Sequence, residues 1–235
     1  MGEIIQVNGG EALLELFKTQ GIDYILCSPL SVWAPLWEAL AKQKEVNKAE
    51  FPIYINCRHE ILAVGLASGY YKATGRLQAV LLPTGLGVLN GSMAIRGAYQ
   101  ERIPMIILAP NSLSFGEIPR FDPGAEWAPF LGDLGGPVRA SESFVKWAKE
   151  VKTPRELVSS FFRACYLSEM VPRGPTLLSI PFDILMDTIP LTPQSKPKPC
   201  PLVAPADNLK DAAEMLAQSK NPIIITDHAV RTYQE

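Results

Sequence analysis

Short apolar runs alternate with longer amphipathic stretches along most of this chain, and this alternation constrains the fold more than any other feature. The apolar runs have the length of strands and are apolar throughout, as expected when neither face of a sheet meets water. They predict strands at residues 24–27, 51–55, 77–82, 104–109 and 175–180. The alternation therefore predicts an α/β fold, with a mainly parallel sheet and helices on both faces.

The amphipathic stretches between these runs predict the helices. They span residues 9–21, 31–44, 59–75, 87–99 and 154–170. Gly9 opens the first helix and Gly21 closes it, while Ser31 is the expected N-cap of the second. Right-handed crossovers would bring the loops that follow the strands to one edge of the sheet, where ligands bind in folds of this kind.

Two regions interrupt the alternation. Residues 111–139 have no clear period and predict either a functional loop, such as a lid or pocket wall, or a disordered segment. Residues 190–205 contain six prolines, a density that blocks helix and sheet and favours an extended spacer. We therefore expect one domain over residues 1–189, a linker over 190–205 and the incomplete start of a second domain over 206–235. A helix at 206–219 and a strand at 222–226 could not bury their own apolar faces.

Composition and charge narrow the classes of function. A hydrophobic fraction of 47% and a charged fraction of 20% are typical of a globular protein. The formal net charge of -2 gives no basic surface for nucleic acid or acidic lipid. No apolar run has the length of a membrane span, and the N-terminus does not resemble a secretory signal. We expect a cytoplasmic protein, with neither nucleic acid nor membrane as a partner. The cysteines and histidines have no zinc or redox spacing, so no metal ligand is predicted in the chain.

The run Arg58-His59-Glu60 is the first candidate for a chemical role, because it follows an expected strand and opens an expected helix. The helix dipole favours a glutamate in the first turn, and most such acids are simply solvated. Here the neighbours, Cys57 and residues 61–63, are apolar and would disfavour the ionised form of the carboxyl. Position alone leaves Glu60 either a surface acid or a catalytic carboxyl.

The run Pro83-Thr84-Gly85-Leu86-Gly87 is the second candidate. It joins an expected buried strand to a helix, and its glycines would permit a tight turn and the close approach of a ligand. It is not a Walker loop, because no Gly-Lys-Ser/Thr follows, and it lacks the glycine that the dinucleotide fingerprint requires at Asn90. A nucleotide-binding α/β module and a plain turn without a ligand remain as alternatives.

Together these motifs resemble a known family. Arg58-His59-Glu60 is followed by Ala67-Ser68-Gly69-Tyr70, Ala73-Thr74-Gly75 and the runs at 83–90 and 98–104. This series is similar to the pyrimidine-binding domain of thiamine-diphosphate enzymes, such as acetolactate synthase and benzoylformate decarboxylase. The similarity covers roughly residues 9–190. It implies the same α/β fold and a role in a decarboxylase or carboligase that acts on a small 2-oxoacid.

The resemblance also implies roles for single residues. In the family, the glutamate after Arg-His hydrogen-bonds N1′ of the aminopyrimidine and favours the tautomer that removes the C2 proton of the thiazolium. Glu60 would be that catalytic residue, while His59 would order the loop or transfer a proton. The residues implied to bind thiamine diphosphate are Pro29, Glu60, Thr84, Gly85 and Asn90.

Two loops depart from the family pattern. The first reads Cys27-Ser28-Pro29-Leu30 where relatives commonly carry Gly-x-Pro-Gly. The second reads Thr84-Gly85-Leu86-Gly87 where relatives carry Ser/Thr-Gly-Pro-Gly. Both changes alter how the backbone would approach the ring.

The family's second half is missing from this sequence. Relatives bind Mg²⁺ and the diphosphate through a domain marked by Gly-Asp-Gly and a downstream asparagine, and Gly132-Asp133-Leu134-Gly135 is not that motif. The resemblance therefore implies that Mg²⁺ is bound by a domain absent from this chain. That domain would lie in a separate subunit of a homo- or hetero-oligomer, or in a longer polypeptide of which this is a fragment. A non-catalytic assembly or regulatory subunit of the same fold is the alternative.

Overall fold

The computed structural model describes residues 4–46, 52–111, 135–192, 195–197 and 203–225. Its centre is a six-stranded sheet in the order β3-β2-β4-β5-β7-β6, and each neighbouring pair is parallel. The strands are β2 (Tyr24–Cys27), β3 (Ile53–Asn56), β4 (Ala79–Leu81), β5 (Met105–Asn111), β6 (Trp147–Glu150) and β7 (Pro175–Pro181). Since all six run in one direction, their carboxyl ends share one edge of the sheet.

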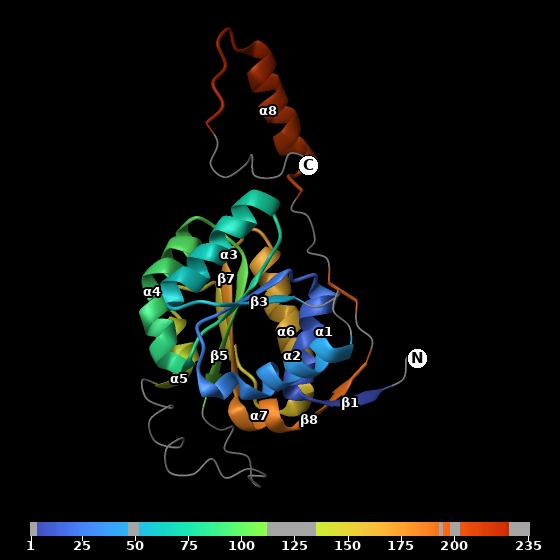
Figure 1. Cartoon of the computed structure of the whole chain (residues 1–235). Helices are drawn as coiled ribbons and strands as arrows, with labels where there is room; N and C mark the ends of the chain where they lie inside the picture. The colour runs from blue at the N-terminus through green and yellow to red at the C-terminus, as the bar shows by residue number, and fades with distance from the viewer. Residues whose placement is uncertain (1–3, 47–51, 112–134, 193–194, 198–202, 226–235) are drawn as a thin grey trace.

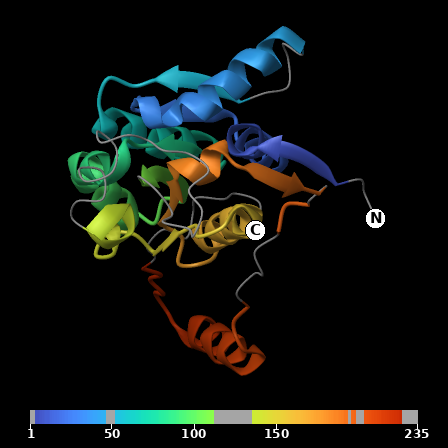
Figure 2. The same cartoon turned by 90° about the horizontal axis from the view of Figure 1, so that it is seen from below.

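Helices cover both faces of this sheet, which confirms the predicted fold class (Figures 1 and 2). One layer contains α1 (Gly9–Gln20), α2 (Ala34–Val46) and α6 (Pro154–Glu169). The other contains α3 (Glu60–Thr74), α4 (Thr84–Gln100) and α5 (Gly136–Ser141). The short helix α7 (Phe182–Met186) follows β7 and packs with the first layer.

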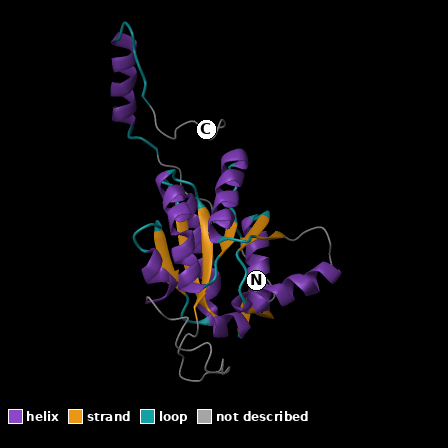
Figure 3. Ribbon diagram, turned by 60° about the vertical axis from the view of Figure 1, so that its left-hand side comes forward, coloured by secondary structure: helices purple, strands orange, loops and turns teal. Residues whose placement is uncertain are grey.

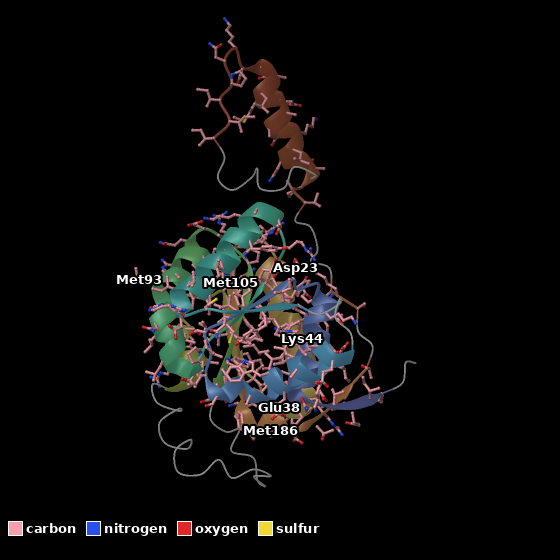
Figure 4. The ribbon with its side chains drawn as sticks, viewed as in Figure 1. Asp23, Glu38, Lys44, Met93, Met105 and Met186 are labelled. Carbon is pink, nitrogen blue, oxygen red and sulfur yellow. The ribbon has the colours of Figure 1, made fainter. Side chains whose placement is uncertain are left out.

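Successive residues of an inner strand contribute to different layers, which is why β4 and β5 are apolar over nearly their whole length. In β5, Ile106 and Leu108 pack with α1 and α6, while Met105 and Ile107 pack with α3 and α4. Figure 4 shows Met105 inside the molecule and Met93 on the outside of α4.

The ends of the helices follow from their terminal residues. Asn8 caps α1: its side chain accepts from the Glu11 amide at 2.8 Å, and the Glu11 carboxylate accepts from the Asn8 amide at 3.1 Å. Gly21 ends α1 with φ 77°, a left-handed conformation that glycine adopts at little cost. At Gly10, a Cβ atom would lie 2.2 Å from the Pro35 carbonyl oxygen, so only glycine lets α1 approach α2 this closely.

An antiparallel pair of strands, β1 (Ile5–Asn8) and β8 (Thr188–Leu191), was not predicted. Pro190 was assigned to the linker, yet it pairs with Gln6 within β8. A two-stranded ribbon tolerates proline because one edge of each strand needs no partner. The division into domains at residues 190–205 remains a prediction.

Three local predictions were wrong. Ser31 does not cap α2; it opens a 3-10 helix (Ser31–Trp33), and α2 begins only at Ala34. Helix α4 begins at Thr84 rather than Gly87, so the run 84–87 is the first turn of the helix and not a loop. The irregular region is narrower than predicted: Asn111 ends β5, residues 136–139 belong to α5, and residues 112–134 lie outside the described residues.

Helix α8 (Ala206–Gln218) forms where it was predicted, and none of its residues is buried; Figure 3 shows it apart from the two layers. The strand predicted at 222–226 is not observed over residues 222–225, and none of the described strands pairs with them. Residue 226 lies outside the described residues. Within the described part of the chain, no helix has the length and apolar character needed to cross a membrane.

Candidate active site

Glu60 is a largely buried carboxyl held by two side chains from other elements. It opens α3 directly after β3, at the carboxyl edge of the sheet, and is 8% exposed. Ser28 Oγ donates to Glu60 Oε1 at 3.1 Å, and Asn90 Nδ2 donates to Glu60 Oε2 at 2.8 Å. Because both oxygens accept a hydrogen bond, the carboxyl is fixed in position at this edge.

Ser28 reaches Glu60 because the parallel pairing continues past the end of β2. The Ser28 amide donates to the Leu81 carbonyl at 2.9 Å, and the Cys57 amide donates to the Cys27 carbonyl at 2.7 Å. These bonds tie the first residues after β2 and β3 to neighbouring strands. The backbone under the Ser28–Glu60 contact is therefore as well ordered as the sheet itself.

Asn90 is brought to the site by the close packing of α4 against α3. Gly91, the next residue of α4, is buried, and a Cβ atom there would lie 3.4 Å from the Glu60 Cβ. A Cβ atom at this distance would make ordinary van der Waals contact, so the two helices pack closely here. This packing brings Asn90 within hydrogen-bonding distance of the carboxylate.

The turn between β4 and α4 is formed by Thr84 rather than by the glycines that predicted it. Thr84 is 2% exposed and has φ 37°, whereas neither Gly85 nor Gly87 has a positive φ. A positive φ is uncommon for a β-branched residue and is found mostly at functional sites. Gly87 has a steric role, since a Cβ atom there would lie 2.4 Å from the Pro83 Cδ.

His59 caps α3, and its geometry assigns it a structural contact. Its Nδ1 accepts from the Ile61 amide at 3.2 Å, so this nitrogen carries no proton. The same Nδ1 lies 3.7 Å from Glu60 Oε2. Two acceptors cannot form an ion pair, so in this arrangement His59 orders the start of α3.

Two buried thiols and a tyrosine lie at the ends of β2 and β3, next to the site in the chain. Burial raises the pKa of the Cys27 thiol to about 12, and a hydrogen bond with Tyr54 opposes part of that rise. Burial also raises the pKa of the Tyr54 hydroxyl, which accepts from Trp37 Nε1 at 3.0 Å, and the pKa of the Cys57 thiol. Since all three groups keep their protons at neutral pH, they are poor nucleophiles.

The structure brings two of the predicted site residues, Glu60 and Asn90, into direct contact. Thr84 and Gly85 are buried in the first turn of the same helix as Asn90. Pro29 is exposed and follows Ser28 in the chain. Residues 132–134 of the run considered as a diphosphate motif lie outside the described residues.

Ser28 was missed as a site residue. It appeared in the sequence only as part of a loop that departs from the family pattern. The available signal was its place as the first polar residue after β2, on the strand next to β3, which leads into Glu60.

Comparisons with known proteins point to the family that the motifs resemble. Residues 7–113 match the family described as thiamine pyrophosphate enzyme, N-terminal TPP binding domain. The chain is 29% identical to the acetolactate synthase large subunit of Buchnera aphidicola subsp. Schizaphis graminum over 182 residues, which is 77% of this chain and 29% of that protein. It is 29% identical to the benzoylformate decarboxylase of Pseudomonas aeruginosa over 176 residues, which is 73% of this chain and 31% of that protein.

Solved structures show the same fold. The thiamine diphosphate-dependent 4-hydroxybenzoylformate decarboxylase of Rhodococcus jostii RHA1 superposes with a TM-score of 0.73 at 19% identity, over 92% of this chain and 38% of that one. A putative thiamin diphosphate-dependent enzyme from Mycobacterium smegmatis gives a TM-score of 0.70 at 25% identity, over 88% and 37% of the two chains. This chain spans less than a third of either curated relative. The motifs, the sheet and the matched residues agree: over residues 7–113 the chain is similar to the N-terminal TPP binding domain of thiamine pyrophosphate enzymes, and its fold is the one seen in such enzymes.

Proposed function

We propose that this chain is the pyrimidine-binding part of a thiamine-diphosphate-dependent 2-oxoacid decarboxylase or carboligase, in which Glu60 activates the cofactor. The observation that carries the proposal is the buried Glu60 carboxyl, fixed by Ser28 and Asn90 at the carboxyl edge of the sheet. Ligands bind at this edge in open parallel sheets. The similarity to an acetolactate synthase and to benzoylformate decarboxylases supports a 2-oxoacid as the substrate class.

The residues at this edge fit an aminopyrimidine ring. A carboxylate offers about four lone-pair sites, and Ser28 and Asn90 occupy two of them, so Glu60 keeps acceptor capacity for the ring N1′. Pro29 would provide an apolar contact beside the ring, and Thr84 and Gly85 would line the other side of the pocket. Thiamine diphosphate, when bound, supplies the carbanion chemistry of the reaction.

In this proposal, the protein's part is to orient the ring and to manage one proton. The hydrogen bonds from Ser28 and Asn90 hold the carboxyl of Glu60 toward N1′, and the largely buried position keeps water from competing for the same lone pairs. His59 orders the first turn of α3 and does not transfer the proton.

An exposed apolar surface beside the site supports the proposal that a second domain completes it. The outer sides of α3 and α4 expose large apolar side chains, with Met93 77% and Leu86 64% exposed. We name this the α3/α4 surface; its members are Ile61, Leu62, Leu66, Leu86, Leu89 and Met93. Large apolar side chains exposed on two neighbouring helices are typical of a protein interface. We propose that a diphosphate-binding domain, which also binds Mg²⁺, covers it within an oligomer. A cytoplasmic location remains part of the proposal.

The test is the release of CO₂ from 2-oxoacids, such as pyruvate and benzoylformate, by the protein assembled with its diphosphate-binding domain, thiamine diphosphate and Mg²⁺. Glu60→Gln removes the exchangeable proton with little change of shape, and it should lower kcat by about 10²- to 10⁴-fold. Glu38→Gln is the matched control, because Glu38 is exposed on α2 in the opposite layer (Figure 4). A Glu60→Gln protein with the turnover of the Glu38→Gln protein would exclude Glu60 as the activating residue. An assembly without any turnover would favour the non-catalytic subunit.

A further inference from the structure

We infer that Ser28 is a positioning residue for Glu60, and that its hydroxyl designates Oε1 as the oxygen that exchanges the proton. This inference rests on the proposed function, and it adds a residue for which neither the sequence motifs nor the family resemblance gives a role. It begins from a contact that joins two elements 32 residues apart in the chain, Ser28 Oγ to Glu60 Oε1 at 3.1 Å.

Ser28 is placed too rigidly for this contact to be incidental. Its side chain is buried, with 6% of the residue exposed, and its amide is bonded to the Leu81 carbonyl at 2.9 Å. A buried hydroxyl on an ordered backbone has few orientations available. The one that it adopts points to the carboxylate.

The two partners of Glu60 differ in what they can do when a proton arrives. The Asn90 amide nitrogen, 2.8 Å from Oε2, only donates, so it cannot accept a hydrogen bond from a proton carried by Oε2. The Ser28 hydroxyl can donate or accept, so it stays bonded to Oε1 whether or not this oxygen carries a proton. The proton is therefore tolerated on Oε1 and disfavoured on Oε2.

The other groups near the carboxyl do not remove this asymmetry. His59 Nδ1 lies 3.7 Å from Oε2, but it accepts from the Ile61 amide and has no hydrogen to donate. The neighbouring Gly91 contributes only the close approach of α4. The assignment of the two oxygens thus follows from Ser28 and Asn90 alone.

A buried serine elsewhere in the chain provides a control. Ser160 on α6 is 2% exposed, and its hydroxyl has no hydrogen-bond partner among the described residues. Ser160→Ala removes a buried hydroxyl without removing an interaction. Ser28→Ala makes the same chemical change and removes the bond to Glu60.

Two readouts separate a positioning role from a structural one. In the full 235-residue chain labelled with ¹³C at glutamate Cδ, the Glu60 carboxyl resonance is identified by its loss in Glu60→Gln. Ser28→Ala should shift this resonance, and Ser160→Ala should leave it in place. In the assembled enzyme, the rate of hydrogen–deuterium exchange at C2 of bound thiamine diphosphate should fall about 10- to 100-fold in Ser28→Ala, the loss of one hydrogen bond to a charged group. The Kd for the cofactor should be unchanged, and Ser28→Thr, which keeps the hydroxyl, should restore the rate.

The outcomes distinguish this inference from the proposed function. If Glu60→Gln abolishes C2 exchange while Ser28→Ala changes neither the resonance nor the rate, Ser28 has no positioning role and the proposed function stands. If Glu60→Gln leaves C2 exchange intact, the proposed function fails and this inference fails with it. Should Ser28→Ala not fold, Ser28→Cys under reducing conditions takes its place, because the thiol has a similar size and is a weak donor. A Ser28→Cys protein with the wild-type rate would then contradict the inference.

Discussion

The two helical layers of this domain differ in how many large apolar side chains they leave exposed. In the layer of α1, α2 and α6, the large apolar side chains are turned inward, and Phe161 on α6 is fully buried between Phe17 and Phe162. In the layer of α3 and α4, apolar side chains occur on both sides of each helix. Ala63, Val64 and Ala67 face the sheet, while the α3/α4 surface faces outward. A helix that is apolar on all sides is typical of a buried position.

Both layers pack a buried core on the sheet. The layer of α3 and α4 also holds Glu60 and Asn90, so in the proposed function the layer with exposed apolar side chains carries the site. A catalytic carboxyl next to an uncovered apolar surface is expected where two domains build a site between them. The proposed diphosphate-binding domain would cover the surface and complete the site together.

The largest expected effect tests the contrast in stability between the layers. Phe161→Ala should lower the free energy of unfolding by about 3–5 kcal/mol, because it leaves a cavity in the core under α1 and α6. Met93→Ala should change it by less than about 0.5 kcal/mol in the chain alone, because Met93 is 77% exposed. Denaturant unfolding of the 235-residue chain followed by circular dichroism measures both. A large loss for Met93→Ala would mean that the α3/α4 surface is already covered within the chain.

A smaller effect is expected from charging the α3/α4 surface. Met93→Asp should leave the stability of the chain alone unchanged and weaken its association with the diphosphate-binding domain by about 10-fold or more, since a charge would be buried at the interface. Sedimentation equilibrium with thiamine diphosphate and Mg²⁺ measures the association. Glu38→Asp, on α2 in the opposite layer, is the control. Equal association by the Met93→Asp and control proteins would exclude this surface as the interface.

The sequence predicts the central sheet and the helix ends better than it predicts the β1–β8 pair. Strands such as β4 and β5 were predicted because they are apolar over their whole length, and helix ends were predicted where Gly21 and Gly75 adopt left-handed conformations. The β1–β8 pair was missed because its paired residues lie 180 or more positions apart in the sequence, and because one strand contains a proline. Periodicity within a short window carries no signal for such a pairing.

The site was predicted through its motifs and not through its contacts. Arg58-His59-Glu60 and the run at 83–90 pointed to Glu60 and Asn90, but neither motif contains Ser28. Ser28 joins the site only because β2 lies beside β3 in the sheet. The strained turn at Thr84 was also missed, because glycines next to it offered the simpler explanation.

The smallest expected effect concerns the thiols of the two layers. Cys27 packs with the layer of α1, α2 and α6, and Cys57 packs with the layer of α3 and α4. Burial raises the pKa of the Cys27 thiol from 9.0 to about 12. A raised pKa means that the folded protein holds this proton more tightly than the unfolded chain does. The resulting stabilisation is fully present below about pH 9 and is lost as the pH rises toward 12.

Alkylation measures this protection. At pH 8, iodoacetamide should label Cys27 and Cys57 only slowly in the folded chain and rapidly in denaturant, as read by mass spectrometry of the digested protein. Cys27→Ala should make stability less dependent on pH between 9 and 12. Rapid labelling of Cys27 in the folded chain would show that the core under α1, α2 and α6 is accessible to the reagent at this position.

The measurement that tests the central claim most directly is the rate of hydrogen–deuterium exchange at C2 of thiamine diphosphate bound to the assembled protein, compared between wild type and Glu60→Gln. A carboxyl fixed by Ser28 and Asn90 to exchange a proton with the ring predicts a fall of about 10²- to 10⁴-fold in Glu60→Gln, with the cofactor still bound. Equal exchange rates in the two proteins, at equal occupancy of the cofactor, would contradict the role of Glu60.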